Sequence, residues 1–191
     1  MQQIPDCEIE KGQGSKECSM EVQKPTEKEC PEYWDLCDAQ GNSLGEKIMR
    51  GQAHRPGTYH IVVCVWIRNS KGQILLTLRS RNKKQFPGLW EGLGGSAQAG
   101  ETSLESVVRE VKEEIGLEFS PERFTLLTRL LEKTALVDIY ELRTDFAAED
   151  LILQSEEVDE ARWATVEELQ QIIAEGQFSE AALRRWEAVC I

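Results

Sequence analysis

The chain of 191 residues is acidic, because 29% of its residues are charged and its formal net charge is −12. Such a chain does not present the broad basic surface that binds DNA or RNA, so an anionic substrate would need a metal ion or a local basic patch. Its apolar stretches are too short to span a bilayer, and its first residues lack the pattern of a secretory signal. We therefore expect a cytoplasmic protein with a small-molecule substrate, and neither a nucleic acid polymer nor a membrane as partner.

The chain begins with a polar segment. Residues 1–30 show almost no apolar periodicity, which predicts a flexible N-terminal extension. The folded domain is then expected at residues 31–191. At its start, Gly41 and Asn42 favour a turn between two short strands, and a polar, basic link is predicted for residues 46–58.

Two strands, a loop and a helix start are predicted next. The near-continuous apolar run HIVVCVWI at 60–67 is typical of a strand buried on both faces, and QILLTLRS at 73–80 predicts a second strand. Proline and glycine make residues 82–90 a predicted loop, and the EGLGG that follows is rich in glycine. Thr102 or Ser103 is expected to cap the N-terminus of a helix.

The second half of the chain alternates strands with helices. Strands are predicted at 123–133 and 134–144, followed by a short strand at 162–163. The sequence TVEE, which begins at Thr165, has the pattern of a capping box and predicts a helix there, and a terminal helix is expected at 179–189. The interleaved elements predict an α/β (α+β) fold in which helices cover a sheet.

The helix after Thr102 carries an unusual set of charges. Glu110, Glu113 and Glu114 lie within one and a half turns, where like charges repel each other. The helix is expected to bury a stripe made of Leu104, Val108, Val111 and Ile115, and to present the three glutamates on another face. Two interpretations follow, namely a solvated acidic face or a site for a hard divalent cation.

The spacing around these glutamates decides between the two interpretations. From Gly95 to Leu117 the chain has glycine, five residues, glutamate, seven residues, Arg-Glu, an aliphatic residue, any residue, Glu-Glu, any residue, glycine and an aliphatic residue. This pattern would arise by chance with a probability on the order of 10⁻⁹ for average residue usage. It matches the Nudix box at every defined position, and the chain resembles Nudix hydrolases from about residue 33 to residue 177.

The resemblance implies a fold, a cofactor and a reaction. The fold would be the Nudix α/β/α sandwich with a mixed sheet, and the box at 95–117 would form a loop, a helix and a loop. The reaction would be the Mg²⁺- or Mn²⁺-dependent hydrolysis of a nucleoside diphosphate linked to another group. Carried over position by position, the metal-ligand candidates are Glu110, Glu113 and Glu114, with Glu101 and the Gly95 carbonyl as secondary candidates and Arg109 as an orienting residue.

A carboxylate is also needed to take a proton from the attacking water. Glu110 is the first candidate, and Glu156 or Glu157, on a later loop, is the second. The candidate catalytic set is therefore Glu110, Arg109, Glu113 and Glu157.

The segments upstream of the box resemble the Nudix subgroup related to isopentenyl diphosphate isomerase. In the isomerase, histidines near the first strand help to bind a metal, and His54 and His60 lie at similar places. A second metal site is one interpretation of this pair, and a loop residue with a strand-capping residue is the other. The loop at 90–101 lacks the isomerase cysteine, whereas REVKEE is complete, so a hydrolase is favoured. An isomerase and a non-catalytic Nudix-fold binding module are the alternatives.

One local basic cluster stands out in this acidic chain. Arg79, Arg81, Lys83 and Lys84 lie between the second predicted strand and the FPGLW loop. They predict a rim that binds substrate phosphate, against the alternative of a solvated loop. The sequence leaves the identity of the substrate open, and it also leaves open whether the protein is a homodimer.

Overall fold

The computed structural model describes residues 31–189, so the predicted flexible extension lies outside the described residues. The first element is a hairpin of β1, Tyr33–Cys37, and β2, Ser43–Met49, which forms a two-stranded antiparallel sheet. The predicted polar link was wrong for residues 46–49, because they belong to β2. Pairing of Trp34 with Ile48 and of Asp35 with Lys47 extends the ladder, and Ile48 is buried.

The main sheet has seven strands and is mixed. They are β3 His60–Arg68, β4 Ile74–Arg79, β5 Trp90–Glu91, β6 Leu93–Ser96, β7 Phe124–Leu131, β8 Ala135–Arg143 and β9 Val158–Ala164. The order is β5-β4-β3-β8-β7, with β6 paired to β3 and β9 paired to β4. The central β3 and β8 run parallel, and the other pairs are antiparallel. Two 3₁₀ turns, Pro121–Arg123 and Ala148–Asp150, lie in the connections.

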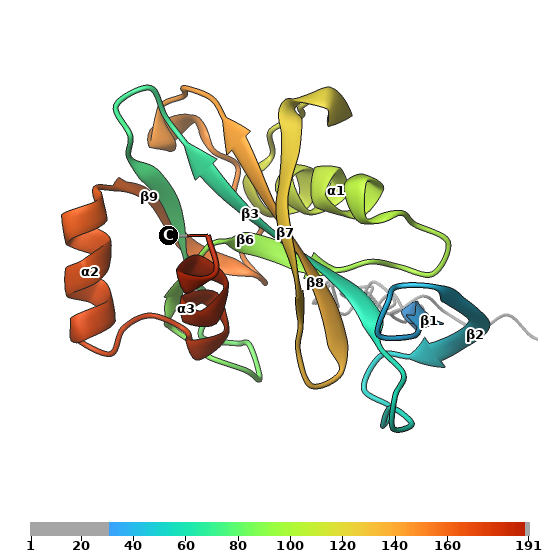
Figure 1. The fold of residues 1–191 in the computed structure, drawn as a ribbon. Helices are drawn as coiled ribbons and strands as arrows, with labels where there is room; N and C mark the ends of the chain where they lie inside the picture. The colour runs from blue at the N-terminus through green and yellow to red at the C-terminus, as the bar shows by residue number, and fades with distance from the viewer. Residues whose placement is uncertain (1–30, 190–191) are drawn as a thin grey trace, which may run out of the picture. The chain divides into compact units, whose positions relative to one another are not determined.

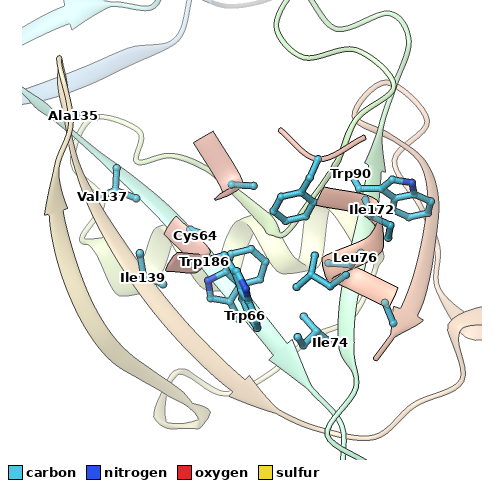
Figure 2. Packing of buried hydrophobic residues seen from close by; sticks show 14 residues of the cluster. Cys64, Trp66, Ile74, Leu76, Trp90, Ala135, Val137, Ile139, Ile172 and Trp186 are labelled. Atoms are coloured by element: carbon cyan, nitrogen blue, oxygen red, sulfur yellow. The ribbon is translucent and has the colours of Figure 1, made fainter. Parts of the chain in front are cut away.

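Helices cover both faces of this sheet (Figure 1). The helices are α1 Ser103–Ile115, α2 Val166–Ala174 and α3 Glu180–Glu187. Cys64 and Trp66 of β3 pack with residues of α2 and α3 (Figure 2), whereas Val63, Val65 and Ile67 pack with residues of α1. The α/β/α sandwich and the doubly buried strand are therefore confirmed. None of the helices within residues 31–189 is long and apolar enough to cross a membrane.

The predicted helix starts are confirmed in detail. Thr102 caps α1 by accepting from the Glu105 backbone N–H, and the Glu105 side chain accepts from the Thr102 N–H in return. Thr165 and Glu168 form the same reciprocal box at the start of α2. At the other end of α1, Gly116 adopts the left-handed conformation with φ 74°, as a glycine readily does after a helix.

Two short strands were missed. Residues 90–91 form β5, where a loop was predicted up to residue 90, and residues 93–96 form β6 within the glycine-rich EGLGG and the serine after it. The glycines serve close packing here: a Cβ added at Gly94 would lie 2.1 Å from the Val63 carbonyl oxygen of β3. Glycine therefore permits the approach of two backbones, although the same residue usually marks a loop. The last strand, β9, is also longer than the predicted 162–163.

Candidate functional site

The face that α1 buries differs from the predicted one. Val107, Val111 and Ile115 are completely buried, whereas Leu104 and Val108 are only partly buried. Glu114 follows Val107 by seven positions and Val111 by three, so it lies on the buried side of the helix and is only 8% exposed. The prediction that all three glutamates face outward is therefore wrong for Glu114, and the set runs from the interior to the surface.

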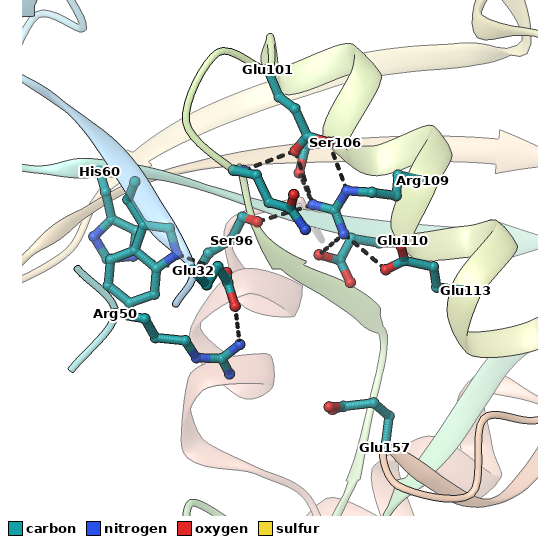
Figure 3. Close-up of polar contacts among 12 residues, drawn as sticks. Glu32, Arg50, His60, Ser96, Glu101, Ser106, Arg109, Glu110, Glu113 and Glu157 are labelled. Carbon is teal, nitrogen blue, oxygen red and sulfur yellow. Dashed lines mark hydrogen bonds and ion pairs between the residues drawn. The ribbon is translucent and has the colours of Figure 1, made fainter. Parts of the chain in front are cut away.

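Arg109 is the centre of the polar network on α1 (Figure 3). Its Nε and Nη2 donate to the two oxygens of Glu101 at 2.7 and 2.9 Å. Its Nη1 donates to Glu110 and to Glu113, both at 2.9 Å, and Nη2 also donates to the Ser96 carbonyl at 3.1 Å. Glu101 and Glu110 raise the pKa of Arg109 above its ordinary value, although burial alone would lower it. The guanidinium thus ties the loop before α1 to the carboxylates on the helix.

Gly95 leaves the space that the Glu110 carboxylate fills. A Cβ added at Gly95 would lie 2.3 Å from Oε1 of Glu110 and 2.6 Å from Oε2. The carboxylate therefore packs directly on the backbone of β6. Two of the predicted metal-ligand candidates, the Glu110 side chain and the main chain at Gly95, are brought into contact by this absence of a side chain.

Several carboxylates crowd together beside Glu110. Burial raises the pKa of Glu114 well above its usual range, and the charges of Glu110, Glu91 and Glu157 raise it further. Burial also raises the pKa of Glu110 to about 7, although Arg109 opposes the shift. The Glu114 carboxylate accepts no hydrogen bond from any residue between 31 and 189. This group therefore has no ion-pair or hydrogen-bond partner in the described chain, although the charge of Arg79 partly opposes the shift of its pKa.

The two glutamates before β9 have different surroundings. Glu157 pairs with Lys83, and its charge acts on both Glu110 and Glu114. Glu156 is exposed and accepts a hydrogen bond from its neighbour Ser155. Glu157 is thus the member of the pair that lies near the helix, although its role as a general base stays a prediction.

The predicted basic cluster divides in two. Arg79 pairs with Glu91, and Lys83 pairs with Glu157, so these two cations lie among the site carboxylates. Arg81 and Lys84 are exposed, and within residues 31–189 neither forms an ion pair. A phosphate-binding role for Arg79, Arg81 and Lys84 stays a prediction.

Replacing Arg79 with alanine is expected to lower the free energy of unfolding by about 3 kcal/mol, because it leaves the largely buried Glu91 carboxylate without its cation. Burial raises the pKa of Glu91, and Arg79 is the main group that opposes this shift. Urea denaturation measures the loss. The matched variant Arg81→Ala should change stability by less than about 0.5 kcal/mol, since its side chain is exposed. Equal stability of the two variants would contradict the buried-pair interpretation.

His60 (Figure 3) stacks on the ring of Trp34, and the ring of His54 lies tilted beside both. The rings of Trp34 and His60 lie 4.0 Å apart and nearly parallel, and His54 lies 5.0 Å from His60. His60 Nδ1 lies 2.9 Å from the Thr134 carbonyl and Nε2 lies 3.5 Å from the Ser96 hydroxyl, while burial lowers its pKa to about 4. His60 is therefore neutral at pH 7, and a metal-binding role for this pair stays a prediction.

The donors around Glu110 fit a hard divalent cation. Glu110, Glu114 and Glu157 supply carboxylate oxygens and Gly95 supplies a carbonyl, the ligand types that Mg²⁺ and Mn²⁺ take. Glu114 in particular is a buried acid without a partner in the described chain. Within residues 31–189, no group of three or more His, Cys, Asp or Glu side chains is already assembled at ligand spacing. Arg109 instead holds the carboxylates of Glu101, Glu110 and Glu113.

The raised pKa of Glu110 predicts how stability of the metal-free protein depends on pH. Because the carboxyl ionises near pH 7 in the fold and near 4.5 in the unfolded chain, stability is lost as pH rises between these values, by up to about 3 kcal/mol. The lowered pKa of His60 has the opposite effect between pH 4 and 6.5. We expect Glu110→Gln to gain stability over the parent protein from pH 5 to pH 8, measured by urea denaturation with EDTA.

This comparison cancels the contribution of His60, which both proteins contain. Mg²⁺ should stabilise the parent protein more at pH 8 than at pH 5, because a cation competes with the proton for the carboxylates. If the difference in unfolding free energy between parent and variant does not change with pH, the prediction is contradicted.

Several residues near the site were not found from the sequence. Glu91 is partly buried near Glu114, and Glu32 with Arg50 lies near Arg109 and Glu110. Glu91 is the first residue of the glycine-rich EGLGG, and only its pairing with β4 places it near the site. Glu32 and Arg50 lie near the site because the β1–β2 hairpin packs beside it. No local sequence pattern indicates that packing.

The arrangement of strand, glycine loop and glutamate helix has known counterparts. The model of the family described as NUDIX domain matches residues 58–187. An uncharacterised Nudix hydrolase of Listeria monocytogenes is 37% identical over 150 residues, which are 77% of this chain and 88% of that protein. The crystal structure of DR0079 from Deinococcus radiodurans covers 82% of this chain and 98% of its own with a TM-score of 0.68 at 28% identity.

The isomerase resemblance extends over a smaller part of the chain. An isopentenyl-diphosphate Delta-isomerase of Escherichia coli is 37% identical over 92 residues, 47% of this chain and half of that enzyme. The family model and the Listeria relative both span more of the chain, and the relative is described as a Nudix hydrolase. The chain belongs to the Nudix family, and it is a Nudix hydrolase.

Proposed function

We propose that this Nudix hydrolase cleaves a diphosphate linkage in a nucleoside diphosphate derivative with the help of Mg²⁺ or Mn²⁺. Nudix enzymes generally act on nucleoside diphosphate derivatives and generally use divalent metals. The observation that carries the proposal is the crowding of Glu110, Glu114 and Glu157, with Glu114 buried and unpartnered in the described chain. A divalent cation would offset the repulsion among these carboxylates and allow Glu110 and Glu114 to ionise together.

The residues have separable tasks in this proposal. Cleavage places charge on phosphoryl oxygens, so catalysis is mainly positioning and electrostatic stabilisation. When bound, a divalent ion polarises the phosphoryl group and lowers the pKa of an attacking water. Glu110, Glu113 and Glu114 would hold the ion, with Glu101 and the Gly95 carbonyl as secondary ligands. Arg109 fixes the direction of Glu101, Glu110 and Glu113 through its hydrogen bonds.

Two glutamates are candidates for the general base. Glu110 is the first candidate because its pKa of about 7 suits proton transfer at neutral pH, and Arg109 holds it in one orientation. Glu157 is the second candidate, since it lies near Glu110 on a different element. Its pairing with Lys83 would have to open for it to accept a proton.

Isomerase activity is not part of the proposal. The loop between Trp90 and Glu101 contains neither cysteine nor histidine, so it supplies no thiol or imidazole for the proton transfers of an isomerisation. Incubation with isopentenyl diphosphate and Mg²⁺ is expected to give no dimethylallyl diphosphate.

The test of the proposal is a substrate screen with the full chain and Mg²⁺ or Mn²⁺. The panel contains nucleoside di- and triphosphates, dinucleotides, nucleotide sugars, coenzyme A derivatives and prenyl diphosphates, and the readout is phosphate or nucleotide release. We expect metal-dependent cleavage of at least one nucleoside diphosphate derivative, lost with EDTA. No turnover on any member with either metal would overturn the proposal.

A further inference from the structure

The β1–β2 hairpin is fixed on the loop that leads into the glutamate helix. The Tyr33 carbonyl accepts a hydrogen bond from the Ala99 N–H at 2.7 Å, and the Asp35 carboxylate accepts one from the Gly100 N–H at 2.6 Å. Between these contacts, the Trp34 ring stacks on His60 of β3. The ends of the hairpin, at Glu32 and Arg50, are therefore held beside the site by both backbone and ring contacts.

Arg50 lies at the end of the hairpin that faces the carboxylates. Its N–H donates to the Glu32 carbonyl at 2.9 Å, and its Nη1 donates to Oε2 of Glu32 at 2.6 Å. The side chain of Arg50 is 57% exposed. Its Nε and Nη2 donate to no other residue between 31 and 189, so most of the guanidinium fork remains available. Figure 3 draws this guanidinium on the side of the site toward which Glu157 also points.

The charges of the site act on this arginine. Its hydrogen bond to Glu32 raises the pKa of Arg50, and the carboxylates of Glu157 and Glu110 raise it further. Arg79 and Lys83 already have Glu91 and Glu157 as partners inside the site. Arg50 differs from both because its partner, Glu32, lies on the border of the site and not in the carboxylate cluster.

A diphosphate that approaches the glutamates has oxygens on two sides. Those on one side face the carboxylates and any cation held there, and those on the other side need a separate positive group. A guanidinium matches two phosphoryl oxygens at once through parallel N–H donors. If a phosphate replaces the partly exposed Glu32 carboxylate, Arg50 keeps a charge-assisted hydrogen bond. Ion pairs that reach the surface are weak enough to be exchanged in this way.

We propose that Arg50 is a substrate-positioning residue. Its guanidinium moves from Glu32 to the diphosphate oxygens that are turned away from the glutamate cluster. In this assignment Glu32 holds the guanidinium in place before the substrate arrives and competes with the diphosphate for it. The assignment deepens the proposed function and rests on it for the identity of the bound group. It also makes Arg50 and Glu32 act in opposite directions, which a purely structural ion pair would not do.

The test is calorimetric titration of inorganic diphosphate into the full chain with Mg²⁺. Arg50→Gln is expected to bind about tenfold more weakly than the parent protein, because a charge-assisted hydrogen bond is lost. Glu32→Gln, which retains an acceptor for the Trp34 indole, should bind as tightly as the parent or more tightly. The matched control is Arg55→Gln, since Arg55 is an exposed arginine that pairs with Glu46 at 2.9 Å. Its affinity should equal that of the parent.

Two outcomes would overturn the assignment in the calorimetry alone. One is an unchanged affinity in Arg50→Gln, and the other is an equal loss in Arg50→Gln and Glu32→Gln, which would reveal a structural pair. With a substrate from the screen, Arg50→Gln should raise KM more than it lowers kcat.

The screen and the titration separate this assignment from the proposed function. Diphosphate binding that depends on Arg50, without hydrolysis of any compound, would refute the hydrolase proposal and retain the assignment. Hydrolysis by a parent protein that binds no diphosphate would retain the proposal and overturn the assignment. Absence of both binding and hydrolysis would overturn both.

Discussion

Replacing Glu114 with glutamine is expected to reduce metal-dependent diphosphate cleavage by more than about a hundredfold, because it removes a ligand from the proposed metal site. The fold should not weaken. Burial and the charges of Glu110, Glu91 and Glu157 disfavour the ionised form of Glu114, and glutamine has the shape of the neutral acid. At pH 8, without metal, the variant should therefore be at least as stable as the parent protein in urea denaturation.

The control for this variant is Glu118→Gln just beyond α1. Glu118 is exposed and pairs with Lys112 at 2.6 Å, so its loss should leave activity unchanged. Loss of a metal ligand should lower activity strongly and leave stability constant or greater. Loss of an ionised acid that stabilises the fold would lower stability as well. Full turnover in Glu114→Gln would refute the metal assignment, and a strongly destabilised variant would show that Glu114 stabilises the fold as an ionised group.

Adding one methyl group at Gly95 is expected to cost more than about a hundredfold in activity, because the Glu110 carboxylate occupies the position of that methyl. The Cβ of Gly95→Ala would lie 2.3 Å from Oε1 of Glu110, closer than any real contact. Glu110 can respond by rotating away, since the clash involves only the end of its side chain. The unfolding free energy should then fall by no more than about 1 kcal/mol. Activity assays and urea denaturation on the same preparation measure both effects.

A double-mutant cycle identifies the route of this effect. If Gly95→Ala acts by displacing Glu110, then adding it to Glu110→Gln should cause little further loss of activity. The Gly95 carbonyl is present in all four proteins, so its contribution cancels. Losses that multiply in the double variant would show that the methyl group acts on something other than Glu110.

Some features of the fold and the site were legible from local sequence patterns. Thr102 and Thr165 were identified as helix starts because a capping box is confined to four residues and needs no tertiary contact. The apolar run from His60 to Ile67 was read correctly because a central strand of a covered sheet is buried on both faces. The family followed from the spacing of the box, which is a property of the chain alone.

The burial of Glu114 was missed for a physical reason. A helical face is chosen from its apolar residues, and a glutamate is normally taken as a sign of exposure. In α1 the buried face includes Glu114, whose ionised form is disfavoured by burial and by neighbouring carboxylates. The rule that a glutamate marks the exposed face therefore fails at this position. Departures of this kind are expected at functional sites.

The remaining parts of the site depend on contacts between distant segments. Asp35 and Gly100 are joined by one hydrogen bond and are 65 positions apart. No local pattern indicates that a hairpin will dock on a loop so far along the chain, and Arg50 could not be placed near Glu110 without that contact. The same holds for Glu91, whose position depends on the pairing of β5 with β4.

The parallel pairing of β3 with β8 also constrains the order in which the protein matures during synthesis. His60 is opposite Ala135, which lies 75 positions later in the chain. The centre of the sheet can therefore form only after β8 has emerged from the ribosome. Glu157, on the border of β9, follows later still. A nascent chain ending at residue 150 therefore carries the complete glutamate helix and both central strands, yet it lacks the carboxylate that borders Glu110 from outside the box. The proposed site is therefore complete only after residue 157 has emerged from the ribosome.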